Sequence, residues 1–128
     1  MGKFEAAVHR WQRRLELMDW QIDIIADIEK AHDGEIGEHA PHVTLDALPA
    51  YKRVSLFYAP DEIKGEEDVT ACHEMIHLIC EPLRDVAEDA LNHVPGRQAR
   101  EVYGRWTSTS LESVVSHLTR LFYRGRRG

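Results

Sequence analysis

Residues 66–82 read EEDVTACHEMIHLICEP, and this pattern predicts a helix around which the rest of the chain can be arranged. Three acidic residues begin the stretch, where negative charge stabilises the positive end of a helix dipole. Pro82 lacks a backbone donor and clashes with the preceding turn, so the helix is predicted to end or kink near Glu81. The apolar residues recur at the spacing of one helix face: Val69, Cys72, Ile76 and Ile79.

The same helix carries a His-Glu-x-x-His motif, which runs from His73 to His77. Residues four apart lie on one helix face, about 6 Å apart along the axis, so both imidazoles can bind one metal ion. Glu74 is rotated by about 100° from His73 and can approach a water on the metal without being a ligand. Zinc accepts imidazole nitrogens, and its catalytic sites keep one position for water. The motif therefore predicts one zinc ion per chain, with Glu74 as the general base.

A catalytic zinc site of this kind needs a third protein ligand. The metzincin arrangement requires glycine where Cys80 stands, and the deformylase arrangement requires a cysteine well upstream of the motif, which this chain lacks. Glu112 is the first choice, because it flanks the apolar face of the last predicted helix. The alternative is a capping box from Thr109 to Glu112, in which Glu112 only satisfies a backbone donor. Four further candidates lie downstream of the motif: His93, His117, Glu88 and Glu101.

Outside the motif helix, hydrophobic periodicity predicts a small sheet and further helices. Apolar residues that recur every three or four positions predict amphipathic helices, and alternation predicts strands. The fold class is therefore α+β, with a sheet of two or three strands in a single domain of residues 1–128. The predicted helices lie at 4–18, 83–91 and 111–122, and the strands at 20–28, 51–58 and, within a mainly loop-like stretch of 29–50, at 43–45.

The composition is that of an ordinary globular protein, with 43% hydrophobic and 30% charged residues in 128. The net charge of −6 disfavours a nucleic-acid partner, because such proteins usually carry basic surfaces. No apolar run approaches the roughly 18 residues of a membrane span, and the first 20 residues lack the core of a signal peptide. Cys72 and Cys80 would lie about 12 Å apart on a helix, too far for a disulfide. We therefore expect a cytoplasmic protein without a membrane partner.

The sequence resembles the zincin metallopeptidases, and among them the very small gluzincin-type proteins of phages and prophages. The resemblance implies a minimal zincin-like domain, in which an N-terminal helix packs on a short twisted sheet and a C-terminal helix supplies Glu112 as the third ligand. It also implies that an edge strand, Val54–Tyr58, holds an extended peptide by strand addition. The similar segments are Met18–Ile22, Tyr51–Tyr58, His73–Leu78 with Pro82–Leu83, and Leu111–Val115.

A weaker resemblance is to the SprT-like proteases, which act on DNA–protein crosslinks and use a third histidine. It implies His93 as the third ligand. The chain lacks the cysteine-rich zinc ribbon that is often found in that family, and its acidity fits DNA poorly.

These features predict a zinc-dependent metalloprotease in which His73, His77 and Glu112 bind zinc and Glu74 activates water for attack on a peptide or protein substrate. The alternative is a non-catalytic, zinc-containing interaction module. The sequence predicts no oligomeric state. The four histidines that precede the motif are expected on the surface: His9, His32, His39 and His42.

A peptidase of this kind also needs a donor that stabilises the developing oxyanion. Tyr103, Arg97 and His117 are of suitable chemistry, and the sequence leaves the choice among them open.

Overall fold

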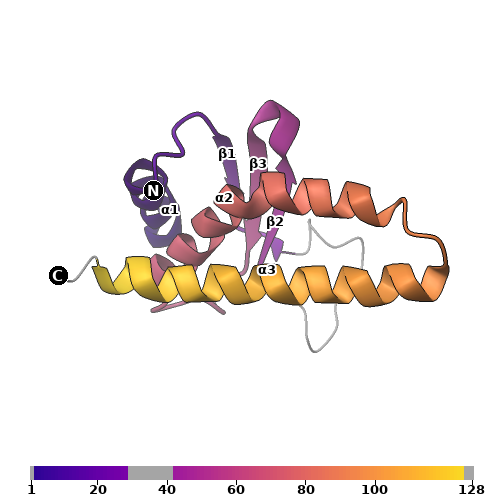
Figure 1. Cartoon of the computed structure of the whole chain (residues 1–128). Coiled ribbons are helices and arrows are strands. Elements are labelled where there is room, and N and C mark those ends of the chain that lie inside the picture. The colour runs from indigo at the N-terminus through magenta and orange to yellow at the C-terminus, as the bar shows by residue number, and fades with distance from the viewer. Residues whose placement is uncertain (1, 29–41, 126–128) are drawn as a thin grey trace. The chain divides into compact units, whose positions relative to one another are not determined.

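The computed structural model describes residues 2–28 and 42–125, and its fold class is α+β, as predicted. The chain divides into two compact units, with the boundary between Met75 and Ile76. That boundary falls inside a helix, and the single domain expected over residues 1–128 stays a prediction. In chain order, the elements (Figure 1) are α1 (Lys3–Arg14), β1 (Gln21–Ile25), β2 (Val43–Leu48), the 3-10 helix η2 (Pro49–Tyr51), β3 (Arg53–Tyr58), α2 (Glu67–Leu91) and α3 (Arg97–Gly125).

The first unit contains a three-stranded mixed sheet in the order β1-β3-β2 (Figure 1). β3 pairs with β1 in parallel and with β2 in the antiparallel direction. The prediction that Val54–Tyr58 is an edge strand is therefore wrong. This segment belongs to the central strand, and β1 and β2 are the outer strands of the described sheet. Val54 and Leu56, two positions apart on this strand, are both buried, as alternation between two faces requires. A period of two reports which face is buried, but not how many neighbours a strand has.

Helix α1 is shorter than predicted, because it ends at Arg14 rather than at Met18. Glu16 has a left-handed backbone, with φ 59°, and the chain turns there. The buried amide of Gln12 holds this turn by donating hydrogen bonds to the carbonyl oxygens of Leu17 and Trp20, at 3.1 and 2.9 Å. The buried apolar face of α1 consists of Phe4, Ala7, Val8 and Trp11.

Trp11 also ties α1 to the start of the motif helix. Its indole nitrogen donates a hydrogen bond of 2.8 Å to Asp68 Oδ1 in the first turn of α2, and the Arg10 guanidinium lies 3.6 Å from the same oxygen. The acidic first turn of α2, which the sequence suggested, therefore also makes a tertiary contact with α1 within the first unit.

Helix α2 passes through Pro82 and ends at Leu91, so of the two predicted outcomes near Glu81 the end is wrong and the kink stays a prediction. Proline costs the helix one backbone hydrogen bond. The residues that follow, including Leu83, Arg84 and Ala87, are good helix formers and carry the helix onward.

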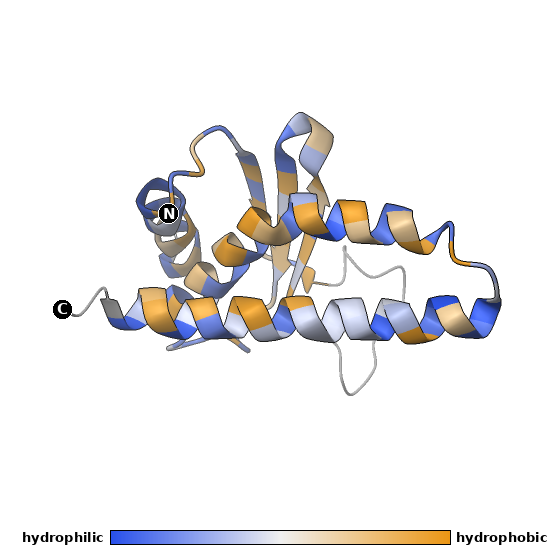
Figure 2. Ribbon diagram, viewed as in Figure 1, coloured by the Kyte–Doolittle hydropathy of each residue, from blue (hydrophilic) through white to orange (hydrophobic). Residues whose placement is uncertain are grey.

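Helix α3 begins at Arg97, well before the predicted start at Leu111. Its first half has no continuous apolar stripe, and Figure 2 shows a pale stretch of intermediate hydropathy within it. The Arg97–Glu101 pair, one turn apart at 3.2 Å, supports the exposed beginning of the helix. None of the helices in residues 2–28 and 42–125 is long and apolar enough to cross a membrane.

Candidate metal centre

Three side chains predicted as metal ligands come together on α2 and α3. His73 and His77 stand one turn apart on α2, and Glu112 comes from α3. The Nε2 atom of His77 lies 3.2 Å from Oε2 of Glu112. One ligand atom from each of the three residues lies within 4.8 Å of the other two. The arrangement forms a group that is able to hold a metal ion.

The chemistry of the donor set fits zinc. Two imidazole nitrogens and one carboxylate oxygen are the ligands of a common class of catalytic zinc site, in which a fourth position is left for water or substrate. Both histidines are only partly exposed, and Glu112 is exposed. Other first-row ions accept the same ligands, so the identity of the ion does not follow from the donors alone.

The position of Glu112 excludes its alternative interpretation as a helix cap. A capping box places its glutamate in the first turn of a helix. Because α3 begins at Arg97, Glu112 lies fifteen positions inside the helix, on the side that faces His77. The Thr109–Glu112 pattern is therefore interior to a helix, and the capping-box prediction is wrong.

Glu74 follows His73 on α2 and is partly buried. It is not one of the three ligands of the group. The helical rotation of about 100° per residue separates it from the face that carries the histidines, as expected for a base that accompanies a metal without binding it. Its role as general base stays a prediction.

The alternative third ligands do not join the group among the described residues. His93 is exposed between α2 and α3, where its Nδ1 lies 3.0 Å from the carbonyl oxygen of Asp89. Glu88 and Glu101 are exposed and form ion pairs with Arg84 and Arg97, at 3.1 and 3.2 Å.

The histidines before the motif lie apart from the group or outside the described residues. His9 is partly buried, with Nδ1 3.2 Å from Gln12 Oε1, and His42 is exposed, 3.9 Å from Glu62. His32 and His39 lie outside the described residues.

The three suggested oxyanion donors all lie on α3, at different distances from Glu112. Along the axis of α3, Arg97 lies about 22 Å and Tyr103 about 13 Å from Glu112 at about 1.5 Å per residue. Arg97 is therefore out of reach, and the ring of Tyr103 packs edge-on against Trp106, with centroids 5.4 Å apart. His117 is the nearest of the three, about 7.5 Å along the axis, but about 140° around it from Glu112.

A small cavity of about 120 Å³ adjoins the candidate metal centre within the second unit. Sequence reasoning missed two of its residues, Glu81 and Arg84. The signal for Glu81 was its spacing, because His73, His77 and Glu81 are successive i, i+4 positions on one face of α2. The cavity is lined mainly by His77, Glu81, Arg84, Ser108, Leu111 and Glu112.

Glu81 is a buried carboxylate, with its side chain 10% exposed. Burial raises the pKa of this carboxyl above its ordinary value, and the charge of Arg84 opposes that shift. The Arg84 guanidinium lies 3.6 Å from Glu81 and 3.1 Å from Glu88, so two carboxylates share one cation. Burial also raises the pKa of the neighbouring Cys80 thiol, which favours its protonated form.

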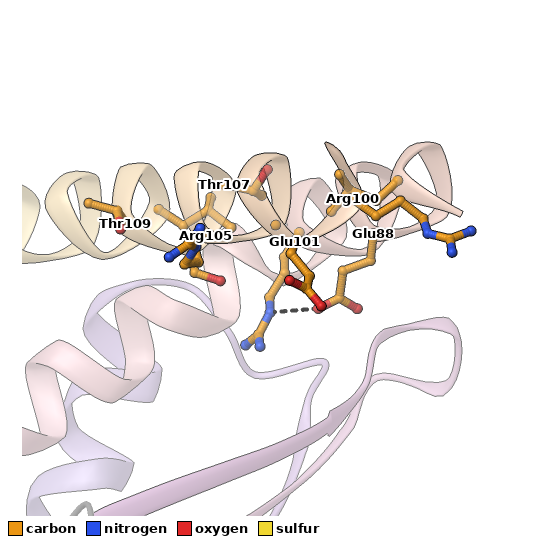
Figure 3. A pocket seen from close by; sticks show the side chains of 11 residues that line it. Glu88, Arg100, Glu101, Arg105, Thr107 and Thr109 are labelled. Carbon is orange, nitrogen blue, oxygen red and sulfur yellow. Dashed lines mark hydrogen bonds and ion pairs between the residues drawn. The ribbon is translucent and has the colours of Figure 1, made fainter. Parts of the chain in front are cut away.

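A larger groove of about 720 Å³ lies between the second half of α2 and the first half of α3 (Figure 3). It shares Arg84, Ser108 and Leu111 with the small cavity, so the two hollows adjoin. The dashed line to Glu88 in Figure 3 marks its ion pair with Arg84. Because Arg84 lines both hollows, it lies where the cavity meets the groove.

No family model matches this sequence, and no curated protein or solved structure matches it either. The function must therefore be argued from the residues of the chain itself.

Proposed function

We propose that this protein is a zinc-dependent metallopeptidase that hydrolyses peptide bonds. The observation that carries the proposal is the group formed by His73, His77 and Glu112, with Glu74 next to the first histidine in a His-Glu-x-x-His helix. Three protein ligands are the number that catalytic zinc sites use, whereas structural zinc sites almost always use four.

The three ligands would hold zinc through Nδ1 or Nε2 of the histidines and a carboxylate oxygen of Glu112. A bound zinc ion lowers the pKa of water towards neutrality and polarises the substrate carbonyl. Glu74 would accept a proton from the attacking water at its carboxylate and would pass that proton to the nitrogen of the departing amine as the carbon–nitrogen bond breaks.

The sheet of the first unit has outer strands that are able to bind an extended peptide, although the strand that the sequence suggested is not one of them. An outer strand can accept a peptide as an additional strand through backbone hydrogen bonds. β3 is central and has both neighbours. Among the described strands of the first unit, β1 and β2 are the outer ones and so have a free edge of this kind.

The test compares wild-type protein, loaded with one equivalent of zinc, with the Glu74→Gln variant on a mixture of unstructured peptides. We expect new peptide termini with the wild type and none with the variant, while both retain zinc. Activity of pure Glu74→Gln protein that stays within about a hundredfold of the wild type would contradict the mechanism. Zinc binding without hydrolysis by the wild type would favour the non-catalytic interaction module instead.

A further inference from the structure

The small cavity is placed to receive part of a substrate that is bound at the candidate metal centre. His77 and Glu112 belong to both the cavity and the ligand group, so an occupant of the cavity lies directly beside the metal. Its volume of about 120 Å³ is well above the roughly 15 Å³ that a single water requires. A side chain next to the scissile bond is therefore the natural occupant.

The charges that line this cavity favour a cation. Arg84 is half exposed and is shared between Glu81 and Glu88, at 3.6 and 3.1 Å. Arg84 lies closer to Glu88, which is outside the cavity lining, and so only partly neutralises Glu81, the more buried of the two carboxylates and the one that lines the cavity. A buried carboxylate is stabilised by a close cation that donates hydrogen bonds to it.

Other occupants fit less well. An acidic side chain would meet Glu81 and would have to compete with two carboxylates for Arg84. An apolar side chain would remove water from the Glu81 carboxylate without replacing its hydrogen bonds, which is costly for a charged group. A lysine or arginine side chain supplies both the positive charge and the donors.

We propose that this cavity is the subsite for a basic side chain of the peptide substrate, and that Glu81 determines its specificity. The proposal rests on the proposed function, since it names the substrate class of the same site. Glu81 acts on the substrate side chain and has no part in the attack of water.

The experiment measures binding, so that it does not depend on hydrolysis. Zinc-loaded Glu74→Gln protein is titrated with a set of alanine-based hexapeptides that carry one lysine or, in its place, one norleucine. Norleucine keeps the length of lysine without its charge. At the best position we expect the lysine peptide to bind about tenfold more tightly, which is the gain typical of a charge-assisted hydrogen bond.

The second arm introduces Glu81→Gln into the same protein. We expect the preference for lysine to fall to about twofold or less, while zinc content stays close to that of the parent and the variant unfolds at no lower temperature. Glu101→Gln is the matched control, because it removes the same charge from an exposed residue whose partner is Arg97, and it should keep the preference. Glu81→Asp keeps the charge on a shorter side chain, so this variant should retain part of the preference for lysine.

Equal binding of the two peptides, failure of both to bind, or a preference that survives Glu81→Gln would each overturn the subsite. Hydrolysis by the wild type is scored separately. Failure of the proposed function is therefore seen as an absence of cleavage, and failure of the subsite as an absence of lysine preference.

Discussion

At the scale of single residues, Glu112 belongs to the candidate metal-binding group and Glu74 does not. Glu112 also contacts His77. A substitution at Glu112 should therefore act on metal affinity, and one at Glu74 on turnover.

The Glu74→Gln variant should retain about one zinc per chain and should lose at least about a hundredfold in hydrolysis rate, because an amide cannot accept the proton of the attacking water. Metal analysis and peptide cleavage on the same preparation test both halves of this statement. Loss of zinc along with activity would show that Glu74 is a ligand and not a base.

Glu81 gives a prediction about pH. Burial raises the pKa of its carboxyl in the folded state above the ordinary value of 4.5. The protonated form is therefore favoured by folding: this contribution to stability is complete below pH 4.5 and is lost as the pH rises through the folded-state pKa. The Glu81→Gln side chain stays neutral at every pH and avoids that loss.

We therefore expect Glu81→Gln to raise the melting temperature relative to the wild type at pH 7.5, and to change it little at pH 4. Scanning calorimetry on zinc-free protein measures this difference without a contribution from metal release in acid. An increase of the same size at both pH values would contradict the assignment of the shift to burial.

At the scale of elements, the rotation of α3 about its own axis places Glu112 towards His77. The same rotation buries Val115, which has no exposed surface, and leaves the adjacent Val114 49% exposed. Glu112 and Val115 are three positions apart and so lie on neighbouring parts of one helix face.

The two adjacent valines provide a matched test of this rotation. Val115→Ala should reduce the free energy of unfolding by about 1–3 kcal/mol, whereas Val114→Ala should change it by less than about 0.5 kcal/mol. Urea unfolding of the two variants measures both values. Equal losses would mean that α3 presents a different face, and the contact between Glu112 and His77 would then be in doubt.

How far the sequence predicts the elements depends on what each pattern encodes. Periodicity located α1, all three strands and the motif helix, because burial of one face leaves a regular trace. It placed the start of α3 too late, because residues 97–110 lack an apolar stripe. It also could not tell that β3 is central, since the neighbours of a strand are not encoded in its own alternation.

At the scale of the whole molecule, the candidate site joins residues that are distant in sequence. The His-Glu-x-x-His motif specified two ligands through local geometry alone. Glu112 was found because its helix carried an apolar face, and its rival interpretation as a cap failed once the full length of α3 was known. Arg84 was missed because a cavity is formed by two elements together, whereas Glu81 could have been found from its i, i+4 spacing after His77.

Removal of the metal should separate the catalytic site from a structural one. Zinc binding to the folded chain adds stability by mass action, about 2.7 kcal/mol at a hundred times the dissociation constant. We expect a chelator to abolish hydrolysis and lower the melting temperature while the far-ultraviolet circular dichroism stays that of a helical protein. Loss of the helical signal at 25 °C would instead indicate a structural zinc.

The most direct test of the account is the zinc content of the wild type and of Glu112→Ala after identical loading and dialysis. Glu101→Ala, another exposed glutamate of α3, serves as the control. We expect one zinc per chain in the wild type and in the control, and a large loss of zinc in Glu112→Ala. Full retention of zinc by Glu112→Ala, or no zinc in the wild type, would contradict the His73, His77 and Glu112 centre.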